Sequence, residues 1–190
     1  EATESAKAIH RTDMRDWALG EILAAQARAG MQREAMITVR RIGDPRLIIV
    51  ALRDIASFLA AAGFAEEALN AAAIIPDDLK RAEALAAIAS LQVHHLDSAG
   101  ARQTALRLTA TARRLDDPAK KVAYFARAAV IFDGAGDRLS ARANLETAET
   151  LARGTARTAK TDTALRHVAA ALAEMGQPAK AMAMLDQLNG

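Results

Sequence analysis

The residues of this sequence best suited to metal binding or proton transfer are its four histidines, His10, His94, His95 and His167. His94 and His95 are adjacent, and neighbouring side chains on a helix diverge by about 100°, so these two are poorly placed to share one metal ion. His167 has no acidic residue at the spacing of metal ligands. A cation near the C-terminus of a helix is stabilised by the helix dipole, which explains His94 and His95 without a metal. We therefore expect no metal site.

Two pairs of adjacent carboxylates could perform acid–base chemistry, Asp77 with Asp78 and Asp116 with Asp117. Each pair adjoins a proline at an expected helix boundary, where capping and turn formation explain it without catalysis. The sequence has no Gly-x-Ser-x-Gly nucleophile motif, no zinc-protease histidine pair and no phosphate-binding glycine loop. It also has no cysteine, which excludes thiol nucleophiles and disulfides. We predict a protein that is not an enzyme and uses no cofactor.

A basic cluster is the best argument for a nucleic acid or an anionic membrane surface as partner. It consists of Arg102, Arg107, Arg113, Arg114, Lys120 and Lys121. The cluster lacks the interleaved aromatic side chains that stack on bases, and Asp116 and Asp117 interrupt it. The formal net charge is only +2, whereas nucleic-acid binders carry a strongly basic patch. We interpret the cluster as a solvated outer face and expect no nucleic-acid partner.

The composition favours helices. Aromatic residues make up 3% of the chain and hydrophobic residues 52%, with alanine abundant, so the core must form through many close helix contacts. No apolar run approaches the ~18 residues that would span a membrane. The sequence starts at Glu1 without a methionine and contains no cysteine. These two features are compatible with an exported, periplasmic protein, which is our expectation for its location.

Five copies of one pattern run through the chain. In each copy, an anchor residue is preceded by mostly apolar residues at eleven, eight and seven positions and followed by an alanine at five positions. In the second copy Leu52, Ile55 and Ala56 precede Gly63, and Ala68 follows it. The five anchors are Gly30, Gly63, Leu96, Gly136 and Gly176. They are separated by 33, 33, 40 and 40 residues.

Each copy predicts two helices. The spacing of its apolar residues places them on one helix face. A glycine at the junction permits the left-handed backbone of a helix C-cap, and the small residue after it lets the second helix lie close to the first. Prolines follow Asp44, Asp117 and Gln177 at expected helix starts, where the two aspartates can act as N-caps. The longer copies gain residues near 109–121 and 151–162, which predicts extended second helices.

This pattern resembles the tetratricopeptide repeat (TPR). The segment "GFAEEAL" is similar to the central turn of that family, a glycine followed five residues later by alanine, although Leu, Phe or Ala occupy its usual tryptophan and tyrosine positions. The resemblance implies an all-α, TPR-like right-handed solenoid of about five antiparallel helix pairs. We expect a single helical-repeat domain over residues 1–190, in which residues 1–12 form an N-terminal cap segment. The repeats would cover about 14–45, 46–77, 78–117, 118–156 and 157–190.

In such solenoids the first helix of each pair lines a concave wall. Its inward stripe would lie 13, 10, 6 and 3 residues before each anchor, a spacing that stays on one helix face. The candidate ligand-binding residues on this stripe are Trp17, Ala24, Val50, Arg53, Ser57, Ala60, Glu83, Ala86, Ser90, Val93, Ala126, Val130, Asp133 and Arg166. Most positions of the stripe are small or apolar, and Arg53 and Arg166 are its only cations. The Lys and Asn clamp for carboxylates that some family members use is absent from it.

Two interpretations of this stripe stay open. The wall could pack against itself as core, or it could be an apolar groove that binds a guest. On the second interpretation, we predict a non-enzymatic binding module or scaffold that holds an apolar or amphipathic segment of a protein partner. The alternative is a carrier that encloses a lipid or a sterol-like small molecule in the helical cavity, in the bacterial cell envelope.

Overall fold

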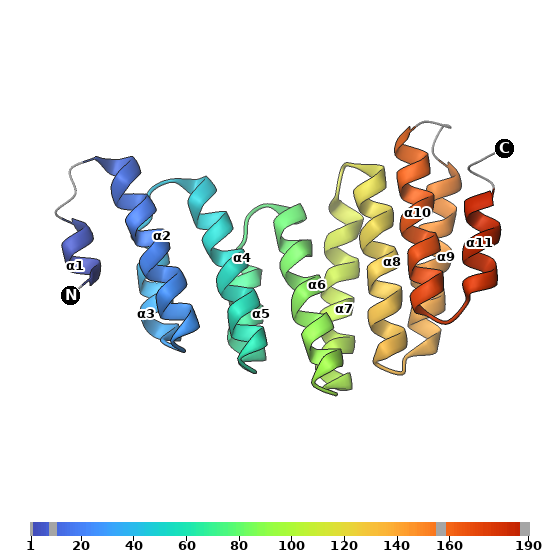
Figure 1. Ribbon diagram of the computed structural model, residues 1–190, viewed down its shortest axis with the longest axis horizontal. Coiled ribbons are helices and arrows are strands. Elements are labelled where there is room, and N and C mark those ends of the chain that lie inside the picture. The colour runs from blue at the N-terminus through green and yellow to red at the C-terminus, as the bar shows by residue number, and fades with distance from the viewer. Residues whose placement is uncertain (1, 8–10, 155–158, 187–190) are drawn as a thin grey trace. The chain divides into compact units, whose positions relative to one another are not determined.

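The structure, a computed structural model, describes residues 2–7, 11–154 and 159–186, and every regular element in these ranges is an α-helix (Figure 1). The helices are α1 (Ala2–Lys7), α2 (Thr12–Arg28), α3 (Gln32–Val39), α4 (Pro45–Ala61), α5 (Ala65–Ala73), α6 (Asp78–His94), α7 (Ser98–Arg114), α8 (Pro118–Gly134), α9 (Arg138–Gly154), α10 (Ala159–Glu174) and α11 (Pro178–Asp186). The predicted all-α class is confirmed. The chain divides into two compact units, Glu1–Leu91 and Gln92–Gly190, which we describe separately.

Each of the five anchors has a positive φ angle, between 61° and 86°. Glycine adopts this left-handed conformation without steric cost, but Leu96 adopts it too, at 61°. Each anchor ends one helix and precedes the next by a few residues: α2 and α3, α4 and α5, α6 and α7, α8 and α9, α10 and α11. The junctions predicted from the repeated pattern are therefore confirmed in backbone conformation.

The same hydrogen bonds form at every junction. At Gly63, the Phe64 amide donates to the Leu59 carbonyl at 2.8 Å and the Gly63 amide donates to the Ala60 carbonyl at 3.1 Å. This pair of bonds is the Schellman motif, and it satisfies carbonyls that the helix end would otherwise leave without partners. The amide of Ala68 then donates to the Phe64 carbonyl at 3.0 Å, so the second helix starts directly after the turn.

The alanine five residues after each anchor is buried, as the pattern predicts. The exposed fractions are 0% for Ala35, Ala68 and Ala101, 1% for Ala141 and 5% for Ala181. A larger side chain at these positions would push the two helices apart. The close approach of each second helix to its junction therefore depends on a methyl group.

Aspartates cap α4 and α8, two of the helices that begin with proline. Asp44 accepts the Arg46 amide at 2.8 Å, and Asp117 accepts the Ala119 and Lys120 amides at 2.8 and 3.1 Å. Both predicted N-caps are confirmed. Asp77 also accepts a backbone amide, that of Lys80, at 2.7 Å. One member of each adjacent carboxylate pair is thus a helix cap.

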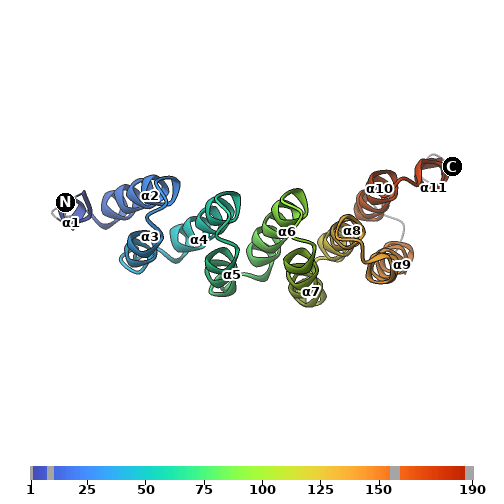
Figure 2. The same ribbon diagram turned by 90° about the horizontal axis from the view of Figure 1, so that it is seen from below.

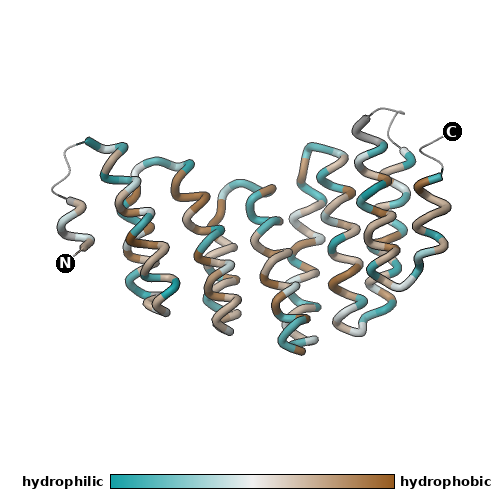
Figure 3. Tube along the Cα trace, in the orientation of Figure 1, coloured by the Kyte–Doolittle hydropathy of each residue, from teal (hydrophilic) through white to brown (hydrophobic). Residues whose placement is uncertain are grey.

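Within the first unit, α2 packs against α3 and α4, and α4 packs against α5. Figure 2 shows α2 and α4 in one layer and α3 and α5 in the other. In the second unit, α8 packs against α7, α9 and α10, and α10 also packs against α9 and α11. Hydrophobic and hydrophilic residues alternate along the helices, as expected where one face is packed and the other is exposed (Figure 3).

The two longer copies owe their length to their second helices. The helices α7 and α9 each contain 17 residues, against 8 in α3 and 9 in α5. The added residues correspond to about two helical turns. The predicted extension of the second helices is confirmed; of the segment predicted to carry it, residues 155–158 lie outside the described residues.

Replacing Leu96 with glycine should raise the free energy of unfolding by about 0.5–1 kcal/mol. A left-handed conformation costs an L-residue about 1–2 kcal/mol, and the greater freedom of glycine in the unfolded chain offsets part of this gain. The Leu96 side chain is 88% exposed, so its removal costs little packing. Urea denaturation followed by circular dichroism measures the change. A loss of stability would show that Leu96 makes contacts worth more than its backbone strain.

The reverse substitution, Gly136→Ala, should lower the free energy of unfolding by about 1 kcal/mol through backbone conformation alone. A Cβ atom at Gly136 would meet no other atom within 4 Å, so no collision contributes to this loss. Gly154, at the end of α9, is the matched control because it has the same free space without a left-handed φ. Gly154→Ala should leave the urea midpoint unchanged or raise it. Equal losses in both variants would contradict the explanation.

Candidate functional site

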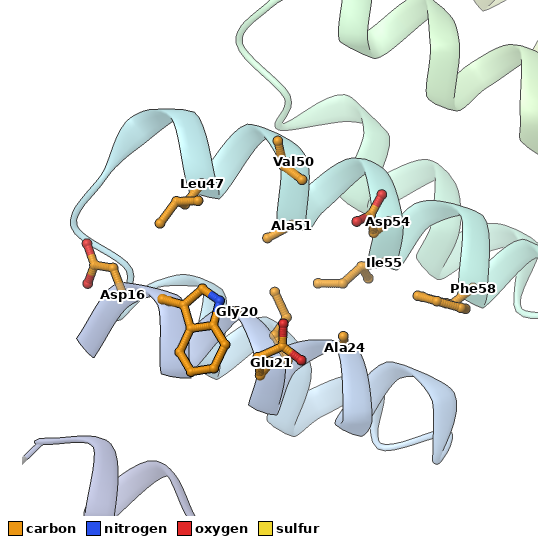
Figure 4. A pocket seen from close by; sticks show the side chains of 12 residues that line it. Asp16, Gly20, Glu21, Ala24, Leu47, Val50, Ala51, Asp54, Ile55 and Phe58 are labelled. Carbon is orange, nitrogen blue, oxygen red and sulfur yellow. The ribbon is translucent and has the colours of Figure 1, made fainter. Parts of the chain in front are cut away.

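A cleft of about 200 Å³ lies between α2 and α4 in the first unit (Figure 4). We call it the α2–α4 cleft. Its lining residues are Asp16, Trp17, Gly20, Glu21, Leu23 and Ala24 from α2, and Leu47, Val50, Ala51, Asp54, Ile55 and Phe58 from α4. The lining is therefore mainly apolar, with three carboxylates.

Small residues on both helices open this cleft. Gly20 and Ala24 of α2 face the side of α4 that carries Ala51 (Figure 4). A Cβ atom built on Gly20 would meet nothing within 4 Å. Larger side chains close the bottom, since Leu23 is 2% exposed and Ile55 is 1% exposed. The result is a hollow with an apolar floor that the protein's own side chains do not fill.

Two large apolar residues of the cleft remain exposed. Trp17 has 65% of its surface exposed and Val50 has 41%. An exposed tryptophan beside an apolar hollow is typical of an interaction surface, because the indole ring offers a large contact area together with one hydrogen-bond donor. Trp17 is also the only tryptophan in the chain, so its fluorescence reports on this cleft.

All ionisable residues that line the α2–α4 cleft are acidic. Asp54 is bound by the neighbouring Arg53, whose Nη2 lies 2.7 Å from its carboxylate. Glu21 is exposed, whereas Asp16 is only 4% exposed. The cleft thus combines an apolar floor with negative charge at its edge.

Asp16 holds the two helices of the cleft in place. Its Oδ2 atom accepts the amides of Gly43 and Asp44 at 3.0 and 2.8 Å, which ties the start of α2 to the turn before α4. Arg15 contributes a more distant attraction, with Nε 3.7 Å from Oδ1. Sequence reasoning missed Asp16, because its partners are backbone amides 27 and 28 residues away.

A second cleft, of about 330 Å³, lies between α8 and α10 in the second unit. We call it the α8–α10 cleft. Its lining residues are Lys120, Ala123, Tyr124, Ala126, Arg127 and Val130 from α8, and His167, Ala170, Ala171 and Glu174 from α10. This cleft is more polar than the first and carries mostly basic groups.

The structure distributes the predicted ligand-binding residues between several environments. Trp17, Ala24 and Val50 line the α2–α4 cleft, and Ala126 and Val130 line the α8–α10 cleft. The other predicted residues line neither of these clefts: Arg53, Ser57, Ala60, Glu83, Ala86, Ser90, Val93, Asp133 and Arg166. For all of them, a role in binding stays a prediction.

Local contacts explain several of the residues outside the clefts. Arg53 binds Asp54, and the Ser57 hydroxyl donates to the Arg53 carbonyl at 3.1 Å. Ala60 is only 4% exposed, so its methyl group belongs to the core. Glu83 accepts a hydrogen bond from Lys80 at 3.0 Å. A cleft between two neighbouring helices is lined by the sides on which these two helices face each other. The predicted stripe instead took the same sequence positions in every repeat, so it includes residues that do not face a cleft.

Within the described ranges, the residues considered for metal binding do not gather. No three histidine, cysteine or acidic residues come together to hold a metal ion in the part of the chain that the structure describes. His94 and His95 lie at the end of α6 with ring centroids 5.7 Å apart, while His10 lies outside the described residues.

No helix in the described ranges is long and apolar enough to cross a membrane.

No protein-family model matches the sequence, and no curated protein matches it significantly.

Replacing Asp16 with alanine should lower the free energy of unfolding by about 1–3 kcal/mol. The substitution leaves two amides without their acceptor in a partly buried position. Asp13→Ala is the control: this fully exposed carboxylate binds Arg11, which together with the Met14 amide holds the pKa of Asp13 below its ordinary value, and its loss should change stability much less than the loss of Asp16. Urea denaturation followed by Trp17 fluorescence compares the two. Equal midpoints would show that Asp16 does not hold α2 to α4.

Proposed function

We propose that this protein is a non-enzymatic binding module whose α2–α4 cleft receives an apolar side chain from an amphipathic segment of a protein partner. The observation that carries this proposal is the unfilled apolar hollow beside the exposed Trp17. Large aromatic residues next to such hollows often contribute most of the binding energy of an interface.

The size of the cleft favours a side chain over a whole lipid. Sites for drug-sized ligands usually measure about 300–1,000 Å³, and the α2–α4 cleft measures about 200 Å³. A sterol or acyl chain would leave much of its surface in water there. Burying one Leu or Phe side chain contributes about 1.5–3 kcal/mol, so stable binding needs further contacts around the anchor. We therefore favour the binding module over the lipid carrier.

The charge of the cleft suggests the sequence of the partner. Glu21 lies exposed at the cleft, Asp54 is paired with Arg53 beside it, and no basic residue lines the cleft. A lysine or arginine beside the apolar anchor would meet this negative charge, whereas an acidic flank would be repelled. The partner we propose is an amphipathic helix with leucine or aromatic anchors and basic flanks.

We also propose that the architecture is a TPR-like right-handed solenoid of about five antiparallel helix pairs. The support for it is the repetition of three features at the same positions of the five copies: the left-handed anchor, the paired Schellman hydrogen bonds and the buried alanine. A buried pair adds to this repetition, because Thr38 donates to Gln26 and Thr104 donates to Gln92 at equivalent positions of copies one and three.

A synthetic amphipathic helix of leucine and lysine should bind and shift the Trp17 emission to shorter wavelength, because the peptide would cover the exposed indole. A matched peptide with glutamate in place of lysine should bind several-fold more weakly. Fluorescence titration at fixed ionic strength measures both. Equal binding of the two peptides would contradict the role of the acidic edge.

The variant Gly20→Leu tests the cleft itself. The added side chain should fill the hollow and abolish peptide binding, while helix propensity at this position improves by about 1 kcal/mol. Ala25→Leu is the matched control, since Ala25 is exposed on α2 and does not line the cleft. Binding that survives Gly20→Leu would place the peptide elsewhere.

Native mass spectrometry of the purified protein, followed by organic extraction, tests the alternative that the protein is a lipid carrier. A lipid bound in stoichiometric amount would overturn our preference for the binding module.

A further inference from the structure

The α8–α10 cleft is built from two facing stripes of side chains. On α8, Lys120, Tyr124 and Arg127 follow at helical spacings of four and three residues. On α10, His167 and Glu174 lie two turns apart, with small alanines between them. Each stripe therefore has two charged or titratable groups, one near each end of the cleft.

One end of the cleft is closed by an ion pair. The Nη1 atom of Arg127 lies 3.3 Å from Oε2 of Glu174, which joins α8 to α10 across the opening. Glu174 is the only acidic residue that lines the cleft. The negative charge of Glu174 is therefore paired with Arg127 at this end of the cleft.

The other end of the cleft is lined by two basic groups, Lys120 and His167, and by no carboxylate; the nearby Asp117 is engaged as the N-cap of α8. Among the described residues, neither the Lys120 ammonium nor the His167 ring has a hydrogen-bond or ion-pair partner. Burial lowers the pKa of His167, and the neighbouring charge of Lys120 lowers it further. The charged groups around His167 in the cleft are Lys120 and Arg127 from α8 and Glu174 from α10. The residues that line the cleft provide no counter-ion for these two mutually repelling bases at this end.

We propose that the Lys120–His167 end of the α8–α10 cleft binds an oxyanion, a carboxylate or a phosphate group of a ligand. Lys120 offers a point charge with three donors, and protonated His167 offers an N–H donor from the opposite helix. The volume of about 330 Å³ leaves room for the body of the ligand beside Tyr124. This site belongs to the second unit and does not depend on the function proposed for the α2–α4 cleft.

A bound oxyanion must raise the pKa of His167, because it favours the charged ring and offsets the repulsion by Lys120. Free His167 has a pKa below its ordinary value of 6.5. His167 therefore takes up a proton when the oxyanion binds. The affinity for the oxyanion increases as the pH falls through the pKa of His167.

NMR titration of the His167 ring tests the site with the whole protein. The probes are inorganic phosphate and acetate, each compared with chloride at the same ionic strength, because salt alone screens the repulsion by Lys120. The variant His167→Gln assigns the signal. We expect at least one of the two oxyanions to raise the pKa of His167 by roughly 0.5 relative to chloride, less than the change of 1–3 that close opposite charges can cause, since the cleft is open to solvent.

The variant Lys120→Gln distinguishes a site from a general salt effect. In chloride it should raise the pKa of His167 by removing the repulsion, and it should abolish the further rise caused by the oxyanion. Lys121→Gln is the matched control, because Lys121 is the next residue of α8 but does not line the cleft; its response should equal that of the parent. A response to phosphate alone or to acetate alone identifies the class of ligand. No response to either, or a response that survives Lys120→Gln, would overturn the proposal.

Discussion

The left-handed residue at each helix junction is the constraint on which the rest of the structure depends. It turns the chain so tightly that two backbone amides after the helix donate hydrogen bonds to carbonyls in the last turn of that helix, as the amides of Gly63 and Phe64 do. The next helix then starts within a few residues, and a buried alanine such as Ala68 allows it to lie against the first. Without the positive φ angle, these hydrogen bonds and this close packing would both be lost.

The small side chains that permit close packing also create the clefts. Alanine fills the space between two helices only when they approach closely, and a helix pair separated by larger neighbours leaves a hollow over its small residues. This occurs at Gly20 and Ala24, where the buried Leu23 and Ile55 form the floor of the cleft between α2 and α4. Small side chains therefore pack closely in the core at some positions and leave a hollow at the surface at others.

The two clefts are formed in the same way but differ in chemistry. Each lies between two helices of one layer within its own unit. The α2–α4 cleft offers an apolar floor and acidic groups, whereas the α8–α10 cleft offers Lys120, Arg127 and His167 with Glu174 as the single acid. One scaffold can therefore carry clefts of opposite charge, because only the residues at the edges of the clefts need to change.

The sequence by itself determined the helices, their junctions and their caps. Glycine, aspartate–proline steps and helical spacing act within a few residues, so the local chain specifies φ at Gly63 and the N-caps at Asp44 and Asp117. Only the tertiary structure decided which side of each helix opens to solvent. The stripe predicted from sequence included Trp17 and Val50 of one cleft but placed the buried Ala60 on the same wall. The link from Asp16 to Gly43 and the ion pair of Arg127 with Glu174 join residues 27 and 47 positions apart. Such contacts follow from how helices pack side by side, which the local pattern of one helix does not encode.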